Sequence, residues 1–315
     1  MSLDFTNNDY FIKACQFRKT KDNDKLLSKE DAFLILIKDL KPEQLDNLTE
    51  LFAREGEENT DFSALNENEK NRLYQCALEL LEKKKPLGSE TINNGKTNTS
   101  DWISHSLGEG RLCAVLAEKM NLDPQRAEVM GMLHDYGRKE IHSIQHVIRG
   151  FELLSDMGYD REAISCLTHS FINGGRCASN EIAEDGFYVS PDGIPCWSEG
   201  SKKDDVTRFL EQYEYDDYDR ILNLADLMAS SHGILSPYDR ILDIATRRTI
   251  DPTNRGYFLA ELLRLIAWCS DKMELGLCTE EYSDIYFDNG KQTDYLMQLL
   301  KKVSDEFFDC IKTIL

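Results

Sequence analysis

The chain lacks any long apolar run, and this absence excludes a transmembrane helix. Apolar stretches such as Ala32–Ile37 and Phe258–Trp268 are bounded or interrupted by charged residues, and they fall short of the ~20 residues that cross a bilayer. The N-terminus carries Asp4 and Asn7–Asp9, so it also lacks the basic and then apolar pattern of a secretory signal. We therefore expect a cytoplasmic protein with no membrane partner.

Paired cysteines and an excess of basic charge are missing as well. The nine cysteines, scattered from Cys15 to Cys310, contain no Cys-x-x-Cys spacing, which argues against a disulfide framework and against a zinc ribbon. With 37 basic and 57 acidic side chains, the formal net charge is -20, and this charge disfavours long nucleic acids. A small phosphate ligand stays compatible with the sequence, because a bound metal reverses the local sign of the potential.

Helical periodicity dominates the remainder, and no alternating strand pattern of useful length competes with it. Ser28, with Asp31 three residues on, is a candidate helix cap, and Pro42 and Pro124 are candidate helix starts. We therefore predict an all-α protein, with helices at residues 10–17, 28–40, 42–52, 66–85, 101–120, 124–135, 146–157, 161–169, 215–231, 238–246, 256–275 and 292–315.

Two polar stretches interrupt the helical pattern. Residues 87–100, rich in Gly, Asn, Ser and Thr, predict a linker between an N-terminal helical segment (1–86) and a main domain with C-terminal helices (101–315). Residues 173–205, rich in Gly, Pro, Ser and Asp, predict a long loop of the kind that often acts as a lid or binding loop.

Five of the six histidines fall between residues 101 and 170, which is the pattern of a site and not of scattered surface residues. His105 lies seven residues before Leu112 on an apolar stripe, so it points into the core. His134 and Asp135 end a helix just before Gly137, where adjacent side chains can converge. Imidazole and carboxylate groups are the usual ligands of transition metals, so this cluster indicates a metal site.

Three further residues extend the candidate set. His146 shares a helical face with Gly150, which would leave room for a ligand or metal, and His169 ends its helix. Asp226 lies in an otherwise apolar helical stretch, so its carboxylate must be paired, protonated or coordinated. Each residue alone is more often a hydrogen-bonded core residue than a ligand, and only the combination favours metal. The other two histidines, His142 and His232, have no comparable context and are interpreted as surface or supporting residues.

The ordered set His105, His134-Asp135 and Asp226 resembles the HD-domain superfamily of metal-dependent phosphohydrolases. The resemblance implies an all-α HD bundle in which these four residues coordinate a metal. His146 and His169 look like the additional pair of HD subfamilies with a dinuclear centre, among them HD-GYP phosphodiesterases and bacterial diadenosine tetraphosphate hydrolases. The resemblance thus implies one or two divalent ions, and with two ions Asp135 would bridge them. The candidate metals are Fe, Mn, Zn, Co and Ni, with Mg as a further candidate.

The resemblance also implies a reaction and a substrate class. Hydrolysis of a phosphate ester or anhydride in a small, nucleotide-like substrate would proceed through a metal-activated hydroxide, with Asp135, Arg138 and Lys139 as catalytic candidates. Arg138 stands where the family motif has Lys, and both are cations for phosphate. The Gly-Tyr-Pro signature is absent, which disfavours cyclic dinucleotides. The alternatives are surface ion pairing for Lys139, and a catalytically silent HD domain that binds a nucleotide or metal for regulation; a homo-oligomer is left open.

Overall fold

The computed structural model describes residues 27–38, 66–83, 102–140, 146–172, 187–189, 195–197, 210, 213–230, 233–247, 252–277 and 293–315. Over these residues the protein is all-α, as predicted, and its strands are only two or three residues long. The helices are α2 (Lys29–Ile37), α4 (Glu67–Lys83), α5 (Trp102–Lys119), α6 (Pro124–Leu133), the 3-10 helix η5 (Tyr136–Lys139), α7 (His146–Asp156), α8 (Asp160–Thr168), α11 (Asp217–Asp226), α12 (Pro237–Arg247), α13 (Pro252–Lys272) and α15 (Thr293–Lys312).

Local capping explains where several of these helices begin. The Ser28 side chain accepts a hydrogen bond from the backbone N–H of Asp31, so the predicted cap of α2 is confirmed. Asp123 caps α6 in the same way, and Pro124 occupies the first turn, where a missing N–H costs nothing. At α11, Asp216 forms a reciprocal capping box with Asp219.

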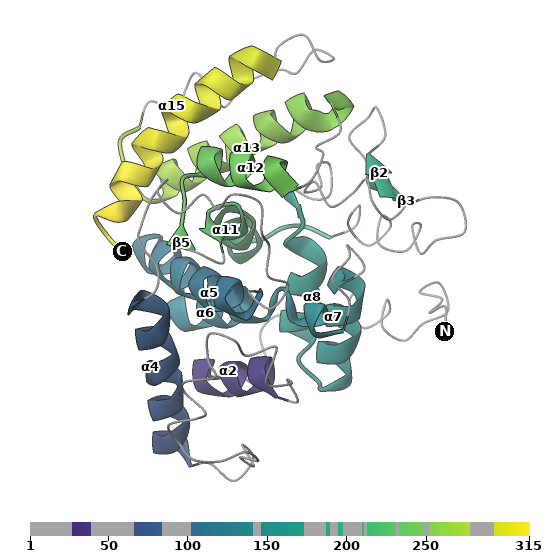
Figure 1. Cartoon of the computed structure of the whole chain (residues 1–315), viewed down its shortest axis with the longest axis vertical. Coiled ribbons are helices and arrows are strands. Elements are labelled where there is room, and N and C mark those ends of the chain that lie inside the picture. Colours follow the sequence, from purple (N-terminus) through teal and green to yellow (C-terminus); the bar gives the residue numbers. More distant parts are fainter. Residues whose placement is uncertain are drawn as a thin grey trace.

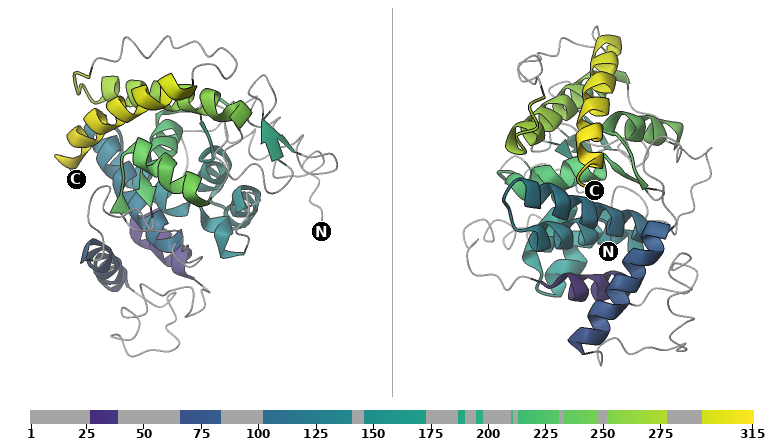
Figure 2. Two further views of the ribbon diagram at one scale, coloured as in Figure 1. Left: turned by 45° about the horizontal axis from the view of Figure 1, so that its top comes forward. Right: turned by 90° about the vertical axis from the view of Figure 1, so that its left-hand side faces the viewer.

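The helices form two packed layers on either side of α5 and α6. One hydrophobic cluster joins α2 and α4 to α7, α8 and the first part of α5, whereas the other joins the second part of α5 to α11, α12, α13 and α15. Figure 1 shows α5 and α6 between these groups, and in both views of Figure 2 α15 lies on the side away from α2. Side chains of α5 and α6 can therefore meet residues from both layers.

Glycines allow α5 and α6 to cross in close contact. A Cβ on Gly131 of α6 would lie 2.8 Å from the Cα of Gly110 on α5, and a Cβ on Gly110 would lie 2.8 Å from the carbonyl oxygen of Glu128. No ordinary side chain fits between two backbones at this distance. The crossing brings the histidine-bearing parts of α5 and α6 together.

The structure contains short strands where none was predicted, so the prediction of a chain without strands is corrected. The predicted helix at 215–231 ends at Asp226, and β4 (Ala229–Ser230) then pairs with β5 (Gly233–Ile234) in an antiparallel hairpin. Within the predicted 173–205 loop, β2 (Phe187–Val189) pairs with β3 (Pro195–Trp197). Strands of two or three residues are too short to produce an alternating sequence pattern, so periodicity does not reveal them.

The N-terminal helices share their core with the main bundle. Phe33 of α2 and Tyr74 of α4 belong to the same cluster as Leu107 and Phe151. The division into residues 1–86, 87–100 and 101–315 stays a prediction. The expected helices at 10–17 and 42–52, the 87–100 linker, His142 and His232 lie outside the described residues. No helix of the described part is long and apolar enough to cross a membrane.

Candidate metal centre

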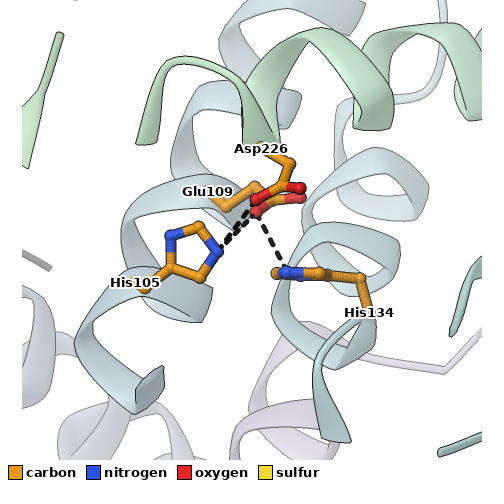
Figure 3. A group of neighbouring side chains, drawn as sticks. All are labelled: His105, Glu109, His134 and Asp226. Carbon is orange, nitrogen blue, oxygen red and sulfur yellow. Dashed lines mark ion pairs between the residues drawn. The ribbon is translucent and has the colours of Figure 1, made fainter. Parts of the chain in front are cut away.

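The first group of candidate ligands comes from three helices. His105 and Glu109 are four residues apart on α5, which places both side chains on one face of that helix. His134 follows α6, and Asp226 is the last residue of α11. In Figure 3 the four side chains point toward one another, and one ligand atom from each lies within 4.8 Å of all the others.

Asp226 closes this group through its contact with α5. Its Oδ1 lies 3.2 Å from Nε2 of His105. On the other side, the guanidinium of Arg240 in α12 donates from Nε to the backbone oxygen of Asp226 at 3.4 Å. This contact helps to hold the C-terminal end of α11 against the cluster.

A backbone hydrogen bond orients the imidazole of His134. Its Nδ1 lies 2.7 Å from the carbonyl oxygen of Gly131 in the preceding turn. A carbonyl can only accept, so Nδ1 carries the proton, and the neutral ring presents a lone pair at Nε2. That Nε2 lies 3.2 Å from Oε2 of Glu109, in the fully buried interior.

Asp135 lies between two pairs of histidines. Its Oδ2 is 3.5 Å from Nε2 of His134 and 3.8 Å from Nε2 of His105. Its Oδ1 is 2.8 Å from Nε2 of His146 and 3.5 Å from Nε2 of His169. The two oxygens of one carboxylate thus face two different sets of nitrogen atoms.

The second pair of histidines is held by α7 and α8. His146 begins α7, His169 follows the end of α8, and their Nε2 atoms are 3.2 Å apart. Ser170 places its hydroxyl 2.9 Å from Nε2 of His169. Asn223 of α11 donates its amide to the backbone oxygens of Thr168 and His169 at 3.0 and 2.7 Å, which ties the end of α8 to α11.

Burial and mutual charge shift the pKa values of these groups. Burial lowers the pKa of His105 to about 4 and raises the pKa of the Glu109 carboxyl well above its usual range. Burial also opposes charge on His134, but the carboxylates of Glu109 and Asp135 outweigh it and raise the His134 pKa to about 10. For Asp135, the nearby Arg138 and His134 overcome burial and hold the pKa well below its usual range. A bound divalent cation favours neutral imidazole and ionised carboxylate at every one of these positions.

The cluster has the chemistry of a divalent metal site. Four buried atoms that face the cluster have no hydrogen-bond partner: both carboxylate oxygens of Glu109, Nε2 of His134 and Oδ1 of Asp135. Buried polar atoms without partners are costly, so such a concentration calls for a ligand. Nitrogen and carboxylate oxygen donors suit Zn, Fe, Mn, Co and Ni. The residues therefore fit a divalent transition metal.

The expected space beside His146 is filled. A Cβ on Gly150 would lie 2.8 Å from Sγ of Cys166 and 3.1 Å from the backbone N of Gly137. The interpretation of Gly150 as room for a ligand or metal was therefore wrong. The glycine instead lets η5 and α8 pack against α7, and this packing brings His146 close to Asp135.

The basic candidates differ in their distance from the cluster. Arg138 contacts it directly, because its Nε donates to Oδ2 of Asp135 at 2.6 Å. Lys139 donates to the backbone oxygen of Lys38 at 3.0 Å and lies over the ring of Tyr136. These contacts direct Lys139 toward the end of α2 and do not support a catalytic role. That role stays a prediction.

Glu109 is the cluster residue that the sequence interpretation missed. A glutamate inside a helix ordinarily indicates a solvent-exposed face, yet Glu109 is 0% exposed. Its position four residues after His105 is the sequence signal that could have placed it in the cluster.

Fold and geometry together define a helical domain with a buried cluster of histidines and carboxylates able to hold divalent metal. Comparison with known families agrees: residues 102–248 match the family model described as HD domain. This match, over somewhat less than half of the chain, points to the HD family of metal-dependent phosphohydrolases, whose members bind divalent metals. All six predicted metal ligands lie within the matched residues.

Two curated relatives match shorter stretches. A 116-residue stretch is 28% identical to a ribonuclease Y of Protochlamydia amoebophila and covers 35% of this chain and 21% of that protein. A 67-residue stretch is 28% identical to a ribonuclease Y of Oleidesulfovibrio alaskensis and covers 21% of this chain and 13% of that protein. The chain therefore spans about a fifth or less of the length of these relatives. No solved structure gives a significant match.

Proposed function

We propose that this protein is a phosphohydrolase with two divalent metal ions, acting on an ester or anhydride bond of a small, nucleotide-like phosphate. The observation that carries the proposal is the position of Asp135, whose two oxygens face different pairs of histidines. A carboxylate in this position suits a bridge between two ions.

The proposed ligands divide into two sets around that bridge. One ion would be held by His105, His134, Asp226 and Oδ2 of Asp135. The second would be held by the remaining histidine pair, with Oδ1 of Asp135 between them. Divalent ions so held would activate a water molecule at neutral pH and neutralise phosphate charge.

Arg138 is the proposed phosphate-binding residue. Its Nε is engaged with Asp135, which fixes the guanidinium beside the cluster, and its side chain retains 18% exposure. A guanidinium offers a planar fork of donors for the charge that spreads over phosphate oxygens during transfer. Arg149, in contrast, pairs with Glu140 and Glu152, so a structural role suits it better.

A small substrate is favoured over RNA. The name of the curated relatives points to RNA as a second candidate substrate. The formal charge of -20 argues against RNA, because it repels a polyanion at long range unless a local basic patch compensates.

Metal loading and turnover test the proposal together. Purified protein, stripped with a chelator and reconstituted separately with Mn, Fe, Zn, Co, Ni and Mg, should retain up to two equivalents of the native ion. The loaded forms would then be assayed against nucleotides, dinucleoside polyphosphates, generic phosphate esters and a single-stranded oligoribonucleotide. His134→Ala combined with Asp135→Ala should abolish both metal retention and turnover.

The outcomes separate the proposal from its alternatives. Retention of less than one equivalent of every ion would refute the metal site, and activity preserved in the double variant would refute the residue assignment. Metal binding without hydrolysis of any substrate would favour the catalytically silent, regulatory HD domain. Hydrolysis of the oligoribonucleotide alone would favour RNA as the substrate.

A further inference from the structure

The carboxylate of Glu109 lies in the cluster of candidate ligands without a hydrogen-bond partner. Both of its oxygens are buried and have no hydrogen-bond donor. Its Oε2 is instead 3.2 Å from Nε2 of His105 and 3.2 Å from Nε2 of His134. In Figure 3 the carboxylate lies beside that of Asp226 and faces the two imidazole rings.

The contact between His134 and Glu109 needs a proton or a metal ion between the two side chains. Because Nδ1 of His134 donates to the Gly131 carbonyl, the neutral ring directs a lone pair toward the Glu109 carboxylate. Two electron-pair donors that face each other at 3.2 Å in a dry interior repel unless a proton or a metal ion lies between them. In a cluster with three further histidines and two further carboxylates, a metal ion satisfies more of these donors than a proton does.

From this geometry we infer that Glu109 is a direct ligand of the first ion, in addition to His105, His134, Asp226 and the shared Asp135, which leaves that site closed by protein residues. The inference rests on the proposed metal-dependent function and deepens it. His105, Glu109, His134 and Asp226 then supply two nitrogen and two carboxylate ligands. The second ion has fewer protein ligands, namely His146, His169 and the shared Asp135.

This asymmetry assigns different tasks to the two ions. Metal sites closed by four protein ligands are generally structural, whereas catalytic sites keep a position open for water or substrate. The first ion is therefore the tightly held one, and its two carboxylates in addition to Asp135 compensate its charge. The second ion, held by His146, His169 and the shared Asp135, would be the more weakly bound one, and with fewer protein ligands it would leave room for water and phosphate.

Glu109→Gln is the decisive variant, since it keeps the size of the side chain and removes its charge. Affinities for the two ions would be measured on the full chain by competition with a metallochromic chelator, using Mn²⁺ and Zn²⁺ alone. We expect two binding steps in the wild type and a loss of about 10- to 100-fold in the tighter step of Glu109→Gln. The weaker step should be retained. Glu109→Asp, which keeps the charge on a shorter side chain, should recover part of the loss.

Thermal unfolding supplies a second readout that does not depend on activity. In excess chelator, Glu109→Gln should unfold at a temperature equal to or above that of the wild type, because it no longer buries an unpartnered carboxylate. With added metal, the order should reverse, since the ligand stabilises the form that binds it better. The control is Glu128→Gln, a buried glutamate of α6 that accepts a hydrogen bond from Tyr74 and lies outside the cluster; it should leave both metal affinities unchanged.

The inference and the proposed function fail in different ways. If the wild type binds two ions and Glu109→Gln has the same two affinities, Glu109 is a protonated core residue and only this inference is overturned. If Glu109→Gln and Glu128→Gln weaken both binding steps to the same extent, the effect is a general loss of packing. This result would also overturn the inference. If the wild type binds no ion at all, the proposed function is overturned along with it.

Discussion

Replacing Gly131 by alanine tests whether the close crossing of α5 and α6 builds the metal centre. The added Cβ would lie 2.8 Å from the Cα of Gly110, 2.9 Å from its N and 3.0 Å from Sγ of Cys113. Two of these three atoms are backbone, so no side-chain rotation relieves the clash. Ordinary contact begins at 3.4 Å, so the helices must separate by about 0.6 Å.

That separation is large compared with what a metal site tolerates. Ligand distances generally stay within about 0.2 Å of their ideal values, and His105 on α5 must share an ion with His134 on α6. We therefore expect Gly131→Ala to lower the affinity for the tighter ion by at least 10-fold. Overpacking should also lower the free energy of unfolding by about 1 to 3 kcal/mol. Chelator competition measures the first effect, and urea unfolding in chelator measures the second.

Gly108→Ala is the matched control, because Gly108 lies on α5, three residues after the candidate ligand His105. A Cβ at Gly108 meets no atom within 4 Å. Alanine is a better helix former than glycine by about 1 kcal/mol, so this variant should be at least as stable as the wild type and should bind metal normally. If Gly131→Ala also binds metal with wild-type affinity, the glycine crossing does not determine the ligand geometry.

Three smaller predictions concern residues around the site and the fold. Asn223→Ala removes the donor to two backbone oxygens at the end of α8; it should cost about 1 to 3 kcal/mol of stability and weaken metal binding, and an unchanged affinity would show that His169 is positioned otherwise. Burial and the charge of Asp216 raise the pKa of Asp219 to about 7 from 3.8, so its neutral form favours folding, and this contribution is lost as pH rises from about 4 to 7. Relative to Asp219→Asn, the chelator-treated wild type should therefore lose at most about 4 kcal/mol of unfolding free energy over that range, and parallel pH profiles would contradict the shift. Ser28→Ala should lower stability by about 1 kcal/mol by removing the cap of α2, with no change in metal affinity; chemical denaturation checks the first part, and equal stability would show that the cap contributes little.

Helix positions were the most predictable feature, because their signals are local. Pro124 marks the start of α6, and Ser28 marks that of α2. The end of α11 was misplaced, since the hairpin that follows Asp226 depends on pairing between β4 and β5 and leaves almost no periodic signal.

The interpretations of Glu109 and Gly150 show where local reasoning stops. Glutamate is usually a surface residue of a helix, and only the approach of α6 and α11 from other parts of the chain buries Glu109. Gly150 was interpreted as free space beside His146, but η5 and α8 occupy that space. In both cases the neighbour that decides the outcome is distant in sequence.

The sequence by itself determined that the chain is helical, and it supplied the ordered set of histidines and aspartates that resembles the HD family. Hydrogen bonding and side-chain periodicity within a helix act over four residues, so both can be recognised in a linear pattern. Only the tertiary structure decided that Asp135 faces two histidine pairs and that Glu109 joins one of them. These contacts depend on how closely α5, α6, α7, α8 and α11 pack, and atomic packing at glycine crossings is a property of the folded chain.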